Sequence, residues 1–271
     1  MLDVVTRPRG PIEWVSDTPS DISVSRGGAG ANIARAAHQG GVDVTYLASV
    51  GRDQAATLFE EALGVPSQLE RSDAPTGILV SLVGDDGQRA MLTQAGANAT
   101  LSADFLESAL RRLRPTWFHL SGYVLLTPET FDAGCRALAV ARDVGAGVSS
   151  DACSVGPLMA TGLRRFGEAL AGIDMFFCNE QEAALFSDHL YLVAPEVIVT
   201  QGAAGATVFF GGADLATRRP SQATNVVDTT GAGDAATGAY LAARLKGLQP
   251  SSALEAAMRA AAEVLAHLGA D

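Results

Sequence analysis

The hydrophobic positions of this chain follow two alternating patterns from about residue 42 onwards. Short apolar runs rich in β-branched residues are followed by alanine-rich stretches of helical character. Continuous apolar strands separated by helices are typical of a parallel sheet covered on both faces. The expected strands are 42–50, 117–120, 144–151, 173–178, 197–200 and a last run that ends at Val226 and Val227. The expected helices are 32–39, 103–113, 128–142, 181–185, 235–245 and 252–268.

Two segments depart from this rhythm. Residues 4–26 are polar, contain three prolines and have no helical periodicity. Residues 76–92 form two alternating runs around a Gly-Asp-Asp-Gly sequence, which is typical of a β-hairpin. Together they predict a small β-appendage beside the α/β core.

Charge and composition exclude several classes of protein. Acidic residues outnumber basic ones by 30 to 19, and the net charge of −11 disfavours general binding to nucleic acid or to an anionic membrane. No apolar run reaches the roughly 18 residues that a membrane-spanning helix needs. Lys246 is the only lysine and is followed by glycine, so neither a P-loop nor a protein-kinase lysine fits.

The cysteines suggest a compartment. There are three, an odd number, and none has CxxC spacing. No secretory signal is recognisable at the start of the sequence. These features predict a cytoplasmic protein in a reducing environment.

Residues 225–234, Asn-Val-Val-Asp-Thr-Thr-Gly-Ala-Gly-Asp, carry the strongest chemical signal. They lead from an expected strand into an expected helix, so the amides of Gly231, Ala232 and Gly233 would point at the space ahead of the helix and bind an anion. Asp234 would repel a bound phosphate, but it is well placed to deprotonate a hydroxyl that attacks that phosphate. The alternatives are a helix-start acid that favours the macrodipole and a weak GxGxxA dinucleotide motif. Phosphoryl transfer is favoured over the dinucleotide site because the motif lies near the C-terminus and no strand-end acid follows about 20 residues later.

A second glycine-rich segment, Arg26-Gly27-Gly28-Ala29-Gly30-Ala31-Asn32, precedes a helix of small residues. Its glycines would let another group approach the backbone closely, and the Asn32 amide could bind a polyol. The alternative is a plain turn with a helix cap.

Together the two segments resemble the PfkB/ribokinase family of carbohydrate kinases. Its members carry Gly-Gly-x-Gly-Ala-Asn near the start and Asp-Thr-x-Gly-Ala-Gly-Asp near the end, and here both occur in that order. The resemblance extends over almost the whole chain. It implies a single ribokinase-like domain, 1–271, with three α/β layers, a mostly parallel central sheet and a β-lid from about 4–26 and 76–92. The implied reaction is ATP-dependent phosphorylation of a hydroxyl of a small sugar.

The resemblance also implies roles for individual residues. Asp234 is similar to the family's general base, and Gly231, Ala232 and Gly233 are similar to its anion hole. Such fixed amides suit phosphoryl transfer, which depends on positioning and charge stabilisation. The positions similar to the family's sugar contacts are Asp3, Gly28 and Asn32.

For the nucleotide and metal, the resemblance points to strand ends in the second half of the chain. Asn179-x-x-Glu182 is similar to a segment that places phosphate and Mg²⁺, with Glu182 acting through water; the alternative is a capping Asn with first-turn acids. Thr200, Gly202 and Gly205 are similar to the lining of the ATP site, or form a simple hairpin. Asp228 and Thr230 are similar to positions that bind a monovalent cation, K⁺, in some members.

The chain also departs from the family pattern. The strand and Gly-Asp that usually precede the equivalent of Asp3 are absent, so either the native chain is trimmed or this sequence is part of a longer one. The second is favoured, because a missing core strand would expose a sheet edge. Arg259 stands where relatives often have Asn near the adenine. The stretch 151–155 lacks the Arg with which relatives hold sugar acids, so we expect a neutral, ribose- or fructose-like sugar. The alternatives are a 2-keto-3-deoxygluconate kinase, a nucleoside kinase or a non-catalytic regulator, and a homodimer through the lid is expected.

Overall fold

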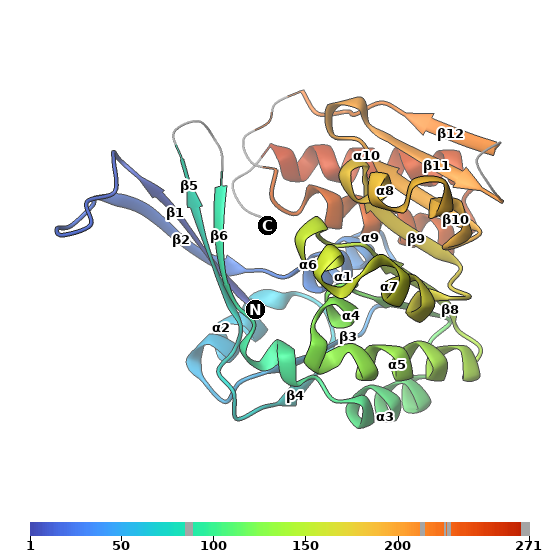
Figure 1. Ribbon diagram of the computed structural model, residues 1–271, viewed down its shortest axis with the longest axis horizontal. Coiled ribbons are helices and arrows are strands. Elements are labelled where there is room, and N and C mark those ends of the chain that lie inside the picture. Colours follow the sequence, from blue (N-terminus) through green and yellow to red (C-terminus); the bar gives the residue numbers. More distant parts are fainter. Residues whose placement is uncertain (85–88, 212–214, 225, 227–228, 267–271) are drawn as a thin grey trace.

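The structure is a computed structural model that describes residues 1–84, 89–211, 215–224, 226 and 229–266. Its central feature is a six-stranded sheet in the order β12-β11-β10-β9-β8-β7 (Figure 1). Strands β7 to β10 are parallel, β11 pairs antiparallel with β10, and β12 pairs antiparallel with β11. The strands are β7 (Trp117–Leu120), β8 (Gly147–Asp151), β9 (Met175–Asn179), β10 (Glu196–Thr200), β11 (Ala206–Phe210) and β12 (Leu215–Arg219).

Helices cover both faces of this sheet, as the continuous apolar runs predicted. Along β9, Phe176 and Cys178 belong to one buried cluster while Met175 and Phe177 belong to another. The first cluster contains the helices α3 (Ala103–Leu113), α5 (Phe131–Asp143), α7 (Leu163–Leu170) and α8 (Glu180–Phe186). The second contains α1 (Ala29–Gln39), α9 (Ala232–Leu245) and α10 (Pro250–Leu265). The three-layer α/β fold is therefore confirmed.

A second sheet forms the expected β-appendage. Its strands are β1 (Leu2–Pro8), β2 (Ser20–Arg26), β5 (Ile78–Val83) and β6 (Arg89–Gln94), in the order β2-β1-β5-β6. In Figure 1 its hairpins project away from the helical layers. β5 and β6 pair antiparallel on either side of the expected turn, whose residues 85–88 lie outside the described part. We call these four strands the lid sheet.

A short parallel pair, β3 (Tyr46–Val50) and β4 (Ser67–Arg71), stands apart from both sheets. Among the described strands, β7 pairs only with β8 and β3 pairs only with β4. Both pairs therefore leave a strand edge without a described partner. The lid sheet is held to this region by Asp53, the cap of α2 (Gln54–Leu63), whose Oδ1 and Oδ2 accept bonds of 2.7 and 2.8 Å from Thr76.

Several expected boundaries shift. The strand expected at 42–50 begins only at Tyr46, and the helix expected at 128–142 begins with a 3-10 turn at Pro128–Thr130. A strand was expected to end at Val226, but Val226 is not part of a strand. The last described strand, β12, ends at Arg219, because Pro220 has no N–H to donate to a neighbouring strand. Val227 lies outside the described residues. Among the described helices, none has the length and apolar composition needed to cross a membrane.

α1 and α9 pack so closely that glycine is required on both helices. A methyl group on Gly238 would lie 2.6 Å from the Ala36 Cβ, and one on Gly40 would lie 2.5 Å from the Ala242 Cβ. These contacts recur at intervals of four residues on both helices, so they follow one ridge of each. One turn towards the helix starts, the same ridges carry Asn32 and Asp234.

Candidate active site

The glycine-rich turn of the second motif opens α9. Gly231 caps the helix with φ 77°, a left-handed conformation that favours glycine, and Ala232 is the first helical residue. The first amides of a helix have no partners within it, so that of Gly233 is available to an anion ahead of α9, while the Ala232 amide donates a long bond of 3.5 Å to the Thr229 carbonyl. A Cβ on Gly233 would meet no heavy atom within 4 Å, so this side of the turn is open.

Asp234 lies in the first turn of α9, where it meets the first motif. The Asn32 Nδ2 donates a hydrogen bond of 2.8 Å to the Asp234 Oδ2, although the two residues are 202 positions apart in sequence. The Asn32 Oδ1 in turn accepts a 2.6 Å bond from the Arg26 Nη1. The structure therefore brings the two predicted motifs into one site.

The surroundings of Asp234 set its protonation. The pKa of its carboxyl is raised to about 7, chiefly because the group is buried and also because Asp151 and Asp3 bring negative charge near it. The hydrogen bond from Asn32 and the positive charge of Arg26 act in the opposite direction and lower this pKa. A carboxyl whose pKa lies near neutrality can both accept and release a proton at physiological pH, as general acid–base catalysis requires.

Asp3 lies on β1 at the base of the lid sheet and is buried. A Cβ on Gly27 would come within 1.9 Å of its carboxylate, so the glycine before Gly28 leaves room for this acid. Gly28, with φ 96°, caps α1 and its carbonyl accepts a bond from the amide of Asn32. The three predicted sugar-binding residues therefore gather around the start of α1.

The predicted nucleotide residues lie at the carboxyl edge of the central sheet. Asn179 and Thr200 end β9 and β10 and are direct neighbours in the parallel register. Asp151 ends β8 at the same edge, beside Phe177. Ligands of open α/β sheets bind at this edge. Gly202 and Gly205 have φ 54° and 95° and turn the chain from β10 into the antiparallel β11, so the hairpin alternative for this segment is confirmed.

Asn179 and Glu182 form a reciprocal capping box at the start of α8. The Asn179 Oδ1 accepts a 2.9 Å bond from the Glu182 amide, and the Glu182 Oε2 accepts a 2.8 Å bond from the Asn179 amide. The helix-capping alternative is therefore confirmed, and it fixes where the Glu182 carboxylate lies. Burial and the charge of Asp151 raise the pKa of Glu182.

The carboxylates of Glu182 and Asp151 fit a Mg²⁺ ion in charge and donor type. Mg²⁺ prefers oxygen ligands and commonly uses one or two carboxylates together with water and substrate phosphates. In the described part of the chain, no group of three His, Cys, Asp or Glu side chains converges as a metal site. Of the predicted monovalent-cation residues, Asp228 lies outside the described residues and Thr230 lies just before the α9 turn.

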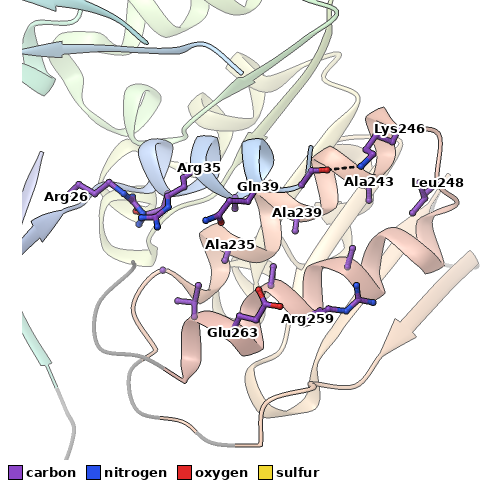
Figure 2. Close-up of a pocket in the computed structure, with 17 residues that line it drawn as sticks. Arg26, Arg35, Gln39, Ala235, Ala239, Ala243, Lys246, Leu248, Arg259 and Glu263 are labelled. Carbon is purple, nitrogen blue, oxygen red and sulfur yellow. Dashed lines mark hydrogen bonds between the residues drawn. The ribbon is translucent and has the colours of Figure 1, made fainter. Parts of the chain in front are cut away.

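A cavity of about 400 Å³ extends from this site between α1, α9 and α10 (Figure 2). Arg26, Asn32 and Gly231 line one end, and Lys246, whose Nζ donates to the Gly40 carbonyl at 2.9 Å, lines the other. Arg259 projects from α10 into the same cavity.

Two residues of the site had no role in the sequence analysis. Arg26 precedes the first glycine motif, and Asp151 was considered only for the arginine that its segment lacks. For Asp151 the available signal was an acid at the end of an apolar run, a position that faces the ligand edge of a parallel sheet. For Arg26 the signal was weaker, since its contacts with Asn32 depend on the fold.

A buried carboxylate at a helix start, beside a sheet edge with further acids, is an arrangement that suits a phosphotransferase. The sequence matches the family described as pfkB family carbohydrate kinase over residues 3–271. The chain belongs to this family and is a sugar kinase. The predicted family is therefore confirmed.

Individual relatives agree with this assignment. An ATP-dependent ribose-1-phosphate kinase from Halopiger xanaduensis is 32% identical over 242 residues, which cover 85% of this chain and 77% of the relative. The adenosine kinase structure from Sinorhizobium meliloti superimposes with a TM-score of 0.86 at 22% identity and covers 100% of this chain and 92% of its own. The Arabidopsis thaliana ribokinase complexed with ribose and ATP has a TM-score of 0.77 at 23% identity and covers 99% and 90%. At these identities, the two structures show the fold alone.

Proposed function

We propose that this kinase transfers the γ-phosphoryl group of ATP to a hydroxyl of a ribose-containing acceptor, with Asp234 as general base. The observation that supports the proposal is the Asn32–Asp234 hydrogen bond, which joins the first glycine-rich motif to a carboxylate of raised pKa in the first turn of α9. The ribose unit is the part shared by the names of the relatives, which are kinases of ribose 1-phosphate and adenosine and a ribokinase bound to ribose.

Each part of the site has a task in this reaction. Asp234 takes the proton of the acceptor hydroxyl, and the amides of Gly231, Ala232 and Gly233 stabilise charge on the transferred phosphoryl group. The acceptor's other hydroxyls contact Asp3, Gly28 and Asn32. The nucleotide lies along the sheet edge, against Asn179, Thr200, Gly202 and Gly205. Mg²⁺, held through water by Glu182, would neutralise phosphate charge, and Asp228 and Thr230 would bind K⁺.

The acceptor is neutral in our first candidate. Asp3 and Asp151 both place negative charge near Asp234, and the buried Arg26 already bonds to Asn32. A second candidate, ribose 1-phosphate, is favoured by the 32% identical relative that carries this name.

We further propose that the lid sheet closes over the acceptor and pairs with a second copy of the chain. Its outer strands and the loop between β1 and β2 expose large apolar side chains: Ile12, Trp14, Val15, Ile22, Val24, Met91 and Leu92. Large apolar side chains that are exposed on one sheet are candidates for contact with a partner.

ADP release with ATP, Mg²⁺ and a panel of acceptors tests the proposal. The panel contains ribose, ribose 1-phosphate, adenosine, inosine, fructose and 2-keto-3-deoxygluconate, and Asp234→Asn is the control for contaminating kinases. We expect turnover with at least one ribose compound, and kcat/KM decides between the neutral and the phosphorylated acceptor. ADP release no faster than in Asp234→Asn across the panel would contradict the proposal, and preference for fructose or the keto acid would overturn the ribose assignment.

A further inference from the structure

Arg26 is an unusual residue to find where it lies. It ends β2 opposite Leu2, and only 1% of it is exposed. A guanidinium at this depth has lost the hydration of its charge, and such a group is retained only where partners compensate for the loss. The partner that faces the site is Asn32, at 2.6 Å, and Figure 2 shows Arg26 at the end of the cavity nearest the start of α1.

The chemistry of this contact determines which way the Asn32 amide points. Arginine has donors and no acceptor, so Arg26 can bind only the oxygen of the amide. The amide nitrogen must then face Asp234, where it donates to the Oδ2 at 2.8 Å. With the amide reversed, its nitrogen would meet the guanidinium and its oxygen would meet the carboxylate, and both contacts would be repulsive.

We propose that Arg26 is a positioning residue for proton transfer, which acts through Asn32 to hold the Asp234 carboxylate in place and ionised. This inference rests on the proposed function, in which Asp234 is the base. Because Arg26 is the last residue of β2, the same contact joins the lid sheet to the base. A movement of the lid sheet that takes Arg26 away from Asn32 frees the Asn32 amide to rotate. Asp234 is therefore fully aligned only while β2 holds Arg26 against Asn32.

The charges around Asp234 explain why Arg26 affects the protonation of this carboxyl. Asp3 from β1 and Asp151 from the end of β8 raise its pKa, and Tyr123 faces it from α4 (Tyr123–Leu126). Among the described groups that shift this pKa, Arg26 is the cation. Its removal also frees the Asn32 amide to rotate away. Both effects favour the protonated acid, so loss of Arg26 raises the pKa of Asp234 above about 7.

The dependence of kcat on pH separates positioning from folding. We expect Arg26→Met to lower kcat at pH 7 by at least about 10-fold. The pH at which kcat falls to half of its maximum on the acidic side should rise by roughly one pH unit, the lower range for loss of a neighbouring opposite charge. Activity is then partly regained at pH 9, and Arg26→Lys, which keeps the charge, shows a smaller displacement. The matched control is Arg164→Met, which removes an exposed arginine on α7. An unchanged kcat, or a loss of equal size at every pH, would overturn the proposal.

A ¹³C NMR titration of the Asp234 carboxyl, assigned with Asp234→Asn, tests the same idea without any acceptor. A raised pKa in Arg26→Met supports the relay even if no acceptor in the panel is phosphorylated, so failure of the proposed function and failure of this inference are distinguishable. If the effect passes through Asn32, Arg26→Met shifts the pKa less in an Asn32→Ala background than in the parent. Equal shifts would refute the relay. Should Arg26→Met not fold, Arg26→Lys and Asn32→Ala remain decisive, since each must raise the pKa of Asp234.

Discussion

Gly238 on α9 lies against Ala36 on α1 with no room for a methyl group between them. A Cβ at 238 would lie 2.4 Å from the Ile33 carbonyl oxygen as well as 2.6 Å from the Ala36 Cβ. Both residues lie one turn beyond the Asn32–Asp234 hydrogen bond. The packing of two helices therefore fixes the distance between the motifs that form the site.

We expect Gly238→Ala to force α1 and α9 apart and so to weaken the Asn32–Asp234 bond. The overpacking should lower the free energy of unfolding by about 1–3 kcal/mol, as urea denaturation would measure. Misalignment should also lower kcat by about 10-fold or more. The matched control is Gly167→Ala on α7, where a Cβ meets nothing within 4 Å and alanine should stabilise the helix. Equal kcat in the two variants would show that this packing does not position the site.

Asp234→Asn should lower kcat by at least about 10²-fold, because the amide cannot accept the acceptor's proton. ATP affinity, measured by calorimetry, should change little, since the anion-binding amides remain. Asp143→Asn, at an exposed acid on α5, serves as the control. Unchanged kcat in Asp234→Asn would remove this residue from the mechanism.

The pH dependence of stability provides a second test of Asp234. Its folded pKa of about 7 lies above the ordinary value of 3.8, so between these values the unfolded state binds fewer protons than the folded state. The free energy of unfolding that this group contributes therefore falls as pH rises from about 4 to 7. Asp234→Asn avoids this loss, and its Tm should exceed that of the parent by at least about 2 °C at pH 8. The advantage should shrink at pH 5; an advantage independent of pH would mean that the carboxyl is not perturbed.

Glu182→Gln should weaken the apparent affinity of the enzyme for Mg²⁺, so that activity reaches half of its maximum at a higher Mg²⁺ concentration. The amide keeps an oxygen for the Asn179 backbone but loses the charge that attracts the ion. Glu180→Gln is a close control, because Glu180 is exposed and lies in the same first turn. The same half-saturation in both variants would argue that Glu182 only caps α8.

Glu196 anchors α9 to the sheet and offers a test of stability away from the chemistry. Its carboxylate accepts bonds of 3.0 and 2.9 Å from Arg244 and a further one from the Tyr240 hydroxyl. Glu196→Gln leaves the partly buried Arg244 without a charged partner and should cost about 1–3 kcal/mol. Breaking the exposed Arg164–Glu168 pair by Glu168→Gln should cost less than about 1 kcal/mol. Similar costs for the two variants would show that burial does not govern the Glu196 pair.

Apolar strands and local caps were readable from the sequence because their signals are local. The run around Phe176 and Phe177 is apolar on both faces, which predicts a strand buried between two helical layers. Polar strands gave no such signal: β4 reads Ser-Gln-Leu-Glu-Arg and β12 reads Leu-Ala-Thr-Arg-Arg, and each forms only because a neighbouring strand supplies a ladder.

The candidate site divides in the same way. The capping box of Asn179 and Glu182 spans three residues and was one of the alternatives open from the sequence. The position of Arg26 could not be predicted from the sequence, because its contact with Asn32 depends on how strand β2 and helix α1 meet in the fold. The family resemblance gave Asn32 and Asp234 roles at the same sugar, but neither it nor any local pattern predicted the hydrogen bond between them.

The span of 202 residues between Asn32 and Asp234 also has a consequence during synthesis. A ribosome that adds about 5–20 residues per second needs roughly 10–40 s to travel from one to the other. Throughout that interval α1 exists without the helix that covers its Ala36 and Gly40 ridge. A nascent chain therefore cannot form the Asn32–Asp234 contact during this interval. A chain that ends before α9 has an α1 face that no helix covers, and it lacks Asp234 and so cannot catalyse the reaction.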